Sequence, residues 1–118
     1  MPLYMTQFAY TPEAWAALVK RPEDRSEVLR ALIEQFGGRM LSFYYSFGEY
    51  DGLAIFEAPD EAAATSALLA VLSPGHNRAL KTTVLLTVEQ AMAGMRQASS
   101  VAYRPPTKDE SDWRPYHD

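Results

Sequence analysis

The segment Gly48-Glu49-Tyr50-Asp51 places two carboxylates next to a phenol. At the mouth of a cleft, Glu49 or Asp51 could serve as a general base and Tyr50 as a hydrogen-bond donor. The same residues suit a tight turn, because glycine tolerates positive φ and aspartate hydrogen-bonds its own backbone. We favour the turn and keep Tyr50, Asp51 and Glu49 as candidate catalytic residues.

Three basic residues, His76, Arg78 and Lys81, lie close together further along the chain. His76 could ligate a metal or haem, or carry a proton near neutral pH, and is the fourth candidate catalytic residue. His117 is the only other histidine, and no paired-histidine motif occurs. We therefore predict no cofactor, with a haem or metal bound through His76 as the less favoured alternative.

Arg78 and Lys81 could bind an anionic ligand such as a carboxylate. Lys81 suits equally well a charge on an edge strand that blocks aggregation. Tyr4, Gln7, Tyr44 and Tyr45 could line a small-molecule pocket, or belong to an interface, where aromatic residues are enriched. We expect one strand face to be an interface and the other to be a pocket. The predicted ligand-binding residues are Tyr4, Gln7, Tyr44, Tyr45, Arg78 and Lys81.

Composition and missing motifs exclude several classes of function. The chain carries 11 basic and 15 acidic residues, a net charge of −4, which argues against nucleic-acid binding. It has no cysteine, so disulfides, thiol nucleophiles and cysteine-ligated metals are ruled out. No glycine-rich dinucleotide motif, phosphate loop or nucleophile elbow is present, so dinucleotide, nucleoside triphosphate and hydrolase sites lack their parts.

The patterns along the chain predict elements in the order β-α-β-β-α-β-α. Strands are expected over residues 3–10, 40–47, 52–57 and 80–86. A helix begins at the Thr11 cap and stops near Pro22, and a second segment has its apolar stripe over residues 28–36. Another helix follows the Asp60 cap to about residue 72, and a last short one begins with a Thr87 and Gln90 capping box.

This order predicts a four-stranded antiparallel sheet with both long helices on one face. Aromatic side chains alternate along the strands, so a single helix layer cannot cover all of them. We infer that a second copy of the chain covers the open face, giving a homodimer or a higher oligomer. The alternative is a monomer whose tail, carrying Trp113 and Tyr116, folds back over the sheet.

The length of 118 residues suits one domain, over residues 1–97, followed by a polar, proline-containing tail over residues 98–118. No signal peptide is recognisable, and no apolar run reaches the roughly 20 residues of a membrane span. We therefore expect a cytoplasmic protein with no membrane or nucleic-acid partner.

Several separated motifs resemble the GYD-domain family. They are residues 1–8, Thr11-Pro12-Glu13-Ala14-Trp15, Gly37-Gly38, the hairpin Phe47-Gly48-Glu49-Tyr50-Asp51, residues 56–60, Lys81-Thr82-Thr83 and Leu85-Leu86-Thr87. The resemblance covers about residues 1–97. It implies an α+β, ferredoxin-like βαββαβ fold of the dimeric α/β-barrel type, here with an extra C-terminal helix. It names no reaction.

Two functions remain open. The first is a homo-oligomeric module for small-molecule binding, sensing or protein interaction. The second is a small enzyme of the dimeric α/β-barrel type, cofactor-independent or haem-linked, that acts on an aromatic or carboxylate compound. The second depends on analogy at the level of the fold, so the sequence does not decide whether the protein is an enzyme.

Overall fold

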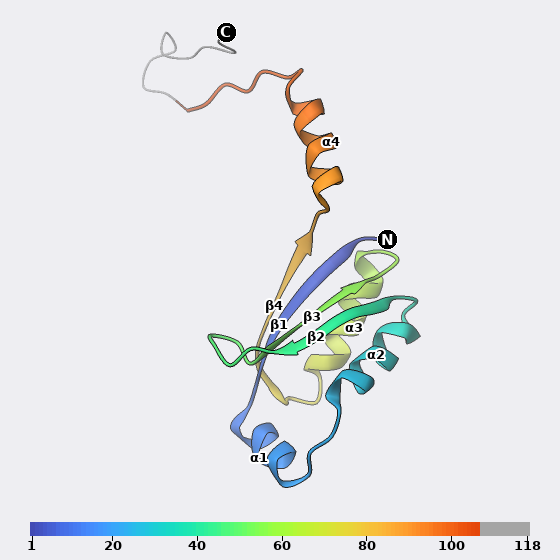
Figure 1. The fold of residues 1–118 in the computed structure, drawn as a ribbon, viewed down its shortest axis with the longest axis vertical. Coiled ribbons are helices and arrows are strands. Elements are labelled where there is room, and N and C mark those ends of the chain that lie inside the picture. The colour runs from blue at the N-terminus through green and yellow to red at the C-terminus, as the bar shows by residue number, and fades with distance from the viewer. Residues whose placement is uncertain (107–118) are drawn as a thin grey trace. The chain divides into compact units, whose positions relative to one another are not determined.

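A computed structural model describes residues 1–106 of the chain. Its elements are, in order, β1 (Leu3–Tyr10), α1 (Pro12–Lys20), α2 (Arg25–Gln35), β2 (Arg39–Tyr45), β3 (Gly52–Glu57), α3 (Glu61–Leu72), β4 (Asn77–Leu85) and α4 (Val88–Ala98). The strands form one antiparallel sheet in the order β2-β3-β1-β4 (Figure 1). This confirms the predicted α+β fold, although β4 begins at Asn77, earlier than expected.

The contacts divide the chain into two units, Met1–Leu85 and a second that begins at Leu86. The first unit holds the sheet and α1 to α3, and the second holds α4. The predicted return of Trp113 and Tyr116 over the sheet concerns residues outside the described range.

Each long helix begins where the sequence supplies a capping side chain. The Thr11 hydroxyl accepts a hydrogen bond from the Ala14 amide at 3.2 Å, and the Asp60 carboxylate accepts one from the Ala63 amide at 2.8 Å. In α4, Thr87 and Gln90 form the predicted reciprocal capping box. These local bonds satisfy amide groups that have no partner inside the helix, which is why these three helix starts could be read from sequence. The cap of α2, Asp24, was not predicted.

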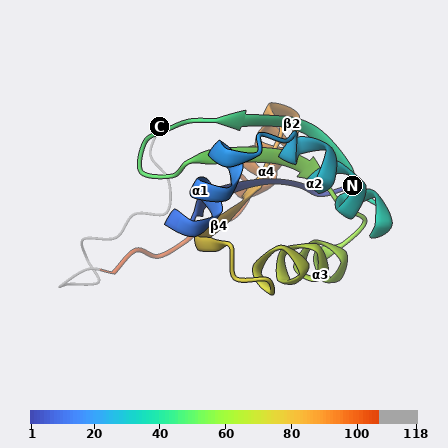
Figure 2. The same cartoon turned by 90° about the horizontal axis from the view of Figure 1, so that it is seen from below.

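One face of the sheet packs against α2 and α3, which lie on the same side of the strands (Figures 1 and 2). Along β1, the even-numbered residues from Tyr4 to Phe8 point to this side and are buried. The core that they form with the neighbouring elements contains Tyr4, Ile33, Met40, Ala54, Phe56, Ala58 and Ala64. Strand alternation and helix placement therefore agree about which side is covered.

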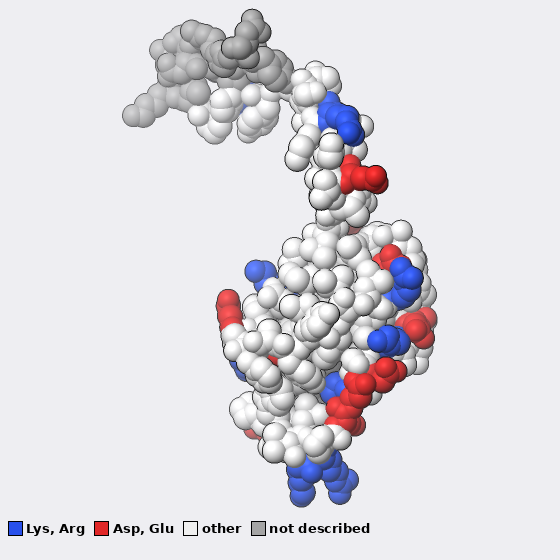
Figure 3. Space-filling view, viewed as in Figure 1, with Lys and Arg blue, Asp and Glu red and all other residues white. Residues whose placement is uncertain are grey.

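The opposite face, which we call the open face, carries partly exposed apolar residues. They come from β1, β3, β2 and β4, and include Leu3, Met5, Leu53, Ile55, Tyr44 and Leu85. Tyr44 is 65% exposed. In the view of Figure 3, the surface over the strands is largely free of charged residues, which gather toward its edges.

Candidate functional site

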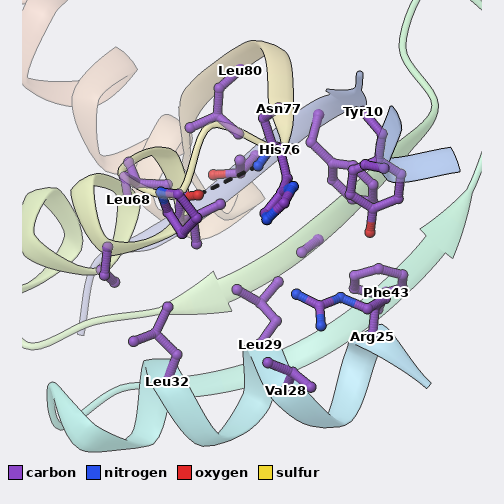
Figure 4. A pocket seen from close by; sticks show the side chains of 18 of the residues that line it. Tyr10, Arg25, Val28, Leu29, Leu32, Phe43, Leu68, His76, Asn77 and Leu80 are labelled. Atoms are coloured by element: carbon purple, nitrogen blue, oxygen red, sulfur yellow. Dashed lines mark hydrogen bonds between the residues drawn. The ribbon is translucent and has the colours of Figure 1, made fainter. Parts of the chain in front are cut away.

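A cavity of about 520 Å³ lies between the helix-covered face of the sheet and the helices α1, α2 and α3 (Figure 4). We call it the sheet-helix cavity. Its walls are mainly apolar, with Phe8 and Phe43 on the sheet, Leu29 and Leu32 on α2, and Leu68 on α3. Small-molecule sites in proteins have this size and this predominance of apolar lining.

Small side chains leave the room for this cavity. Ala14 and Ala17 line it from α1, Ala54 from β3, and Ala67 and Ala70 from α3. An alanine fills little of the space between a helix and a sheet, so the helices can lie over the strands without their side chains meeting in the middle. The alanine-rich sequence of α3, EAAATSALLAVL, is the signal that could have revealed the cavity.

Polar groups collect at one end of the cavity. Tyr10 is the last residue of β1 and pairs with Asn77, the first residue of β4, while the Thr11 amide donates to the His76 carbonyl at 2.9 Å. Arg25 enters from the first position of α2. Figure 4 shows the Arg25 guanidinium and the His76 imidazole pointing toward the same space. The antiparallel pairing of β1 with β4 thus brings residues distant in sequence together.

The charged residues that line this polar end favour an anion. Arg21, Glu23 and Arg25 line the cavity, and Arg25 Nη1 lies 2.8 Å from Glu23 Oε1. Two guanidinium groups against one carboxylate give a local excess of positive charge in a chain whose net charge is −4. Arginine has five N–H donors, so its bond to Glu23 leaves others available.

Tyr10 supplies a hydroxyl that stays protonated. Burial raises the pKa of Tyr10 well above its ordinary value of 10.0, the hydrogen bond and charge interaction with Tyr45 add to the rise, and Arg25 acts in the opposite direction. Its neighbour Asn77 donates through Nδ2 to the Val71 carbonyl at 3.5 Å, and its buried Oδ1 has no hydrogen-bond partner among the described residues. The cavity lining therefore combines donors, the two arginine cations and, on the side toward α3, one unsatisfied acceptor.

Of the four candidate catalytic residues, only His76 lines this cavity; it is an exposed residue of the loop before β4. Glu49 is exposed, and Tyr50 lies in the turn, where its carbonyl accepts hydrogen bonds from Ser46 and Gly48. Asp51 Oδ2 accepts hydrogen bonds from the Tyr10 amide at 2.9 Å and from Trp15 Nε1 at 3.0 Å. The segment does form a turn, but not for the predicted reasons: Asp51 bonds β1 and α1 rather than its own backbone, and the positive φ of this turn is at Phe47 (52°) rather than at Gly48.

The six predicted ligand-binding residues are not gathered at one site. Tyr4 is buried and stacks on Phe56 at 5.4 Å between ring centroids. Gln7 and Lys81 pair across β1 and β4 on the open face, and Tyr44 lies on the same face. The reason is strand alternation, which sends Gln7 and Tyr4 to opposite sides of the sheet.

Arg78 is exposed near the start of β4, and Tyr45 faces the helix side. There it joins a cluster of aromatic rings at one end of the sheet, with centroid distances between 5.2 and 6.5 Å. The cluster contains Phe8, Tyr10, Trp15, Phe43, Tyr45 and Phe47. None of the six predicted ligand residues lines the cavity, but Tyr45 contacts the lining residue Tyr10 and Tyr4 contacts the lining residue Phe56.

Neither a metal cluster nor a membrane helix is found in the part of the chain that the structure describes. Within residues 1–106, no group of three or more histidine, cysteine, aspartate or glutamate side chains is placed to hold a metal ion. None of the helices described over the same range has the length and apolar character needed to cross a bilayer.

Comparison with known sequences gives one family and one named relative. The GYD domain family matches residues 4–94. The protein named glutamine synthetase and cystathionine beta-lyase binding protein, from Thermus thermophilus, is 35% identical over 75 residues, which are 64% of this chain and 79% of that protein. The family match includes both ends of the sheet-helix cavity, since it extends from β1 through β4.

A solved structure with a TM-score of 0.50 shows the same fold at low identity. TTHA0845, also from Thermus thermophilus, superposes with a TM-score of 0.50 at 15% identity, covering 75% of this chain and 96% of that chain. An antibiotic biosynthesis monooxygenase gives a TM-score of 0.46 at 19% identity, covering 75% of this chain and 99% of that chain. At this level of identity the likeness concerns the fold alone.

Proposed function

The chain belongs to the GYD domain family, and we propose that it acts as a homo-oligomeric module that binds a small molecule in the sheet-helix cavity. One observation carries the proposal: an apolar cavity of about 520 Å³ whose charged lining residues all belong to the segment 21–25 at one end. Such a division fixes the orientation of a ligand while burying most of its surface. The proposed ligand site needs no cofactor, and we propose a cytoplasmic location for the module.

The homo-oligomer is proposed from the open face. Its partly exposed apolar residues come from all four strands, which makes the patch continuous across the sheet rather than scattered. A large continuous apolar patch is uncommon on monomers, and a two-fold axis lets the same patch cover itself. We propose that two sheets pack face to face, with Tyr44 and Ile55 in the buried contact.

A second candidate function is the binding of a partner enzyme. The Thermus relative is named for binding two enzymes, and α4 here exposes Val88, Met92 and Met95 at the spacing of one helical face. Flexible methionine side chains suit contacts with protein surfaces. We propose an enzyme subunit as the occupant of this face.

That second function is tested with purified glutamine synthetase from the organism in which this chain occurs. The paired change Met92→Glu and Met95→Glu is expected to weaken binding at least tenfold in surface plasmon resonance. Gln97→Glu places one negative charge on the opposite side of α4 and is expected to change little. Equal affinity for all three proteins would refute docking through this face.

A catalytic role for Asp51 is not part of the proposal, because its Oδ2 is already engaged by Tyr10 and Trp15. The small-enzyme alternative is left with His76 at the rim of the cavity. Retention of binding together with turnover of a bound carboxylate that His76→Gln abolishes would favour the enzyme over the module.

Native mass spectrometry and dye binding test the main proposal together. We expect a dimer or larger assembly, and saturable fluorescence with anilinonaphthalene sulfonate, an anionic apolar dye. Ala70→Trp, which fills the cavity from α3, is expected to remove the saturable signal, while Ala62→Trp on the exposed side of α3 keeps it. A monomer refutes the homo-oligomer, and equal dye binding by both variants refutes the cavity as the site.

A further inference from the structure

We propose that the ligand of the sheet-helix cavity is a monocarboxylate with an extended apolar body, its carboxylate held by Arg25, Tyr10 and His76. The inference deepens the proposed function, because it depends on the cavity being a small-molecule site and adds the chemical class of the molecule. Three features of the cavity carry it: the charge at its polar end, the donors there, and the path of its apolar wall.

The charge at the polar end selects for a negative group. Arg21 and Arg25 face one acidic residue, Glu23, around the opening. The residues that line the cavity therefore carry one excess positive charge, whereas the whole chain has a net charge of −4. An uncharged or cationic head group would have no electrostatic attraction to these arginines, whereas a carboxylate would be attracted to them. The attraction is stronger at a partly buried site, because screening by water is weaker there.

Arg25 is the group placed to form the direct contact. It is partly buried and points into the cavity (Figure 4), and its bond to Glu23 engages Nη1. The planar guanidinium presents its remaining N–H groups as a fork that matches the two oxygens of a carboxylate. An incoming carboxylate can bind Arg25 alongside Glu23, or it can displace Glu23 from Arg25.

Tyr10 and His76 surround the same point from the sheet side. Figure 4 shows Tyr10 and Arg25 at the same end of the cavity. The raised pKa of Tyr10 keeps its hydroxyl protonated over the physiological range, so the hydroxyl can turn its hydrogen from Tyr45 to a bound carboxylate. The His76 side chain points into the same space from the loop before β4 (Figure 4). Two or three N–H and O–H donors that converge on one point form a binding site for a single anionic group.

The apolar wall shows where the rest of the ligand lies. Leu29 and Leu32 on α2 face Leu68 on α3 across the cavity, and Leu32 and Leu68 lie away from Tyr10 and Arg25 in Figure 4. No charged residue lines this part among the residues described; the charged ones all belong to residues 21–25 at the polar end. An alkyl or aryl chain attached to the carboxylate can bury itself there, at roughly 25 cal/mol for each Å² of apolar surface.

Isothermal titration calorimetry of the full chain tests the inference with two probes of the same chain length, decanoate and decanol. We expect decanoate to bind at least tenfold more tightly than decanol. Arg25→Gln should weaken decanoate binding by about ten- to a hundredfold, as loss of a charged hydrogen bond does, and should leave decanol binding unchanged. Arg30→Gln is the matched control: it lies on α2, outside the cavity lining, and pairs weakly with Glu27 at 3.8 Å.

Each outcome has a separate meaning. Equal affinity for decanoate and decanol in the natural protein refutes the carboxylate site but leaves the cavity as a small-molecule site. Loss of decanoate binding in Arg30→Gln as strongly as in Arg25→Gln also refutes it, since general charge would then explain the effect. Binding of neither probe, with dye binding unchanged in Ala70→Trp, refutes the proposed function itself. If Arg25→Gln does not fold, two other measurements test the carboxylate site. They are the decanoate affinity of Arg25→Lys and the comparison of decanoate with decanol on the natural chain.

Discussion

The carboxylate of Asp51 holds the indole ring of Trp15, whose Nε1 donates to Asp51 Oδ2 over 3.0 Å although the two residues are 36 positions apart in sequence. The same oxygen accepts the amide of Tyr10, the last residue of β1. Through these two hydrogen bonds, one carboxylate links the turn before β3 to both β1 and α1. Since Tyr10 and α1 border the sheet-helix cavity, this bond also fixes one side of the proposed ligand site.

Asp51→Asn is predicted to lower the free energy of unfolding by about 2 kcal/mol, because two charged hydrogen bonds become neutral ones. Urea denaturation followed by circular dichroism measures the loss. Glu49→Gln removes a neighbouring exposed carboxylate and should change stability by less than about 0.5 kcal/mol. In a Trp15→Phe background the effect of Asp51→Asn should shrink, and additive effects would contradict the direct bond.

Gly52→Ala is predicted to destabilise the protein by about 1 to 3 kcal/mol. A Cβ at Gly52 would collide with the Phe8 ring and lie 2.8 Å from the Tyr44 carbonyl. The thermal midpoint should fall accordingly. Gly48→Ala is the control, since a Cβ at Gly48 meets nothing within 4 Å, and a similar loss in both variants would argue against the close approach of Phe8.

Stability at high pH is predicted to depend on Tyr10. Burial, with the Tyr45 interaction, raises the pKa of Tyr10 in the folded state above the ordinary 10.0. The stabilisation that this raised pKa provides is complete below pH 10.0. It is lost as the pH rises from 10.0 toward the folded-state pKa, because the Tyr10 hydroxyl of the unfolded chain then releases its proton first. Urea midpoints should fall more steeply in this range for the natural protein than for Tyr10→Phe. Parallel curves would contradict the shift.

Ile55→Glu is predicted to convert the proposed homo-oligomer into a monomer, because it would place a charge without a partner in the contact between two open faces. Light scattering coupled to size-exclusion chromatography reads the mass. Val19→Glu adds the same charge to an exposed apolar position on α1 and should leave the assembly intact. A natural protein that is monomeric at micromolar concentration would refute the assembly before any substitution is made.

The fold could be read from sequence because its signals are local. Thr11, Asp60 and Thr87 cap helices through bonds that span three residues, and strand alternation assigns Tyr4 and Phe8 to one face of β1. The same alternation separates Tyr4 from Gln7, so the predicted grouping of the two in one pocket could have been rejected from the sequence.

The site could not be read in the same way, because it depends on distances between elements. Arg25 on α2 and Asn77 on β4 line one cavity only because of the sheet order and the space left by alanines such as Ala17 and Ala70. Asp51 resembled a catalytic carboxylate because its partner Trp15 is remote in the chain. His76 was found because histidine itself is a conspicuous signal, whereas Arg25 in the first turn of a helix is not.

The central claim is that the ligand binds in the sheet-helix cavity, and locating bound decanoate in the molecule tests it most directly. Nuclear Overhauser effects between bound decanoate and methyl-labelled leucine and isoleucine residues distinguish the two faces of the sheet. The account predicts contacts from the alkyl chain to Leu29, Leu32 and Leu68 in the sheet-helix cavity. Contacts confined to Leu53, Ile55 and Leu85 on the open face, or no contacts at all, would contradict it.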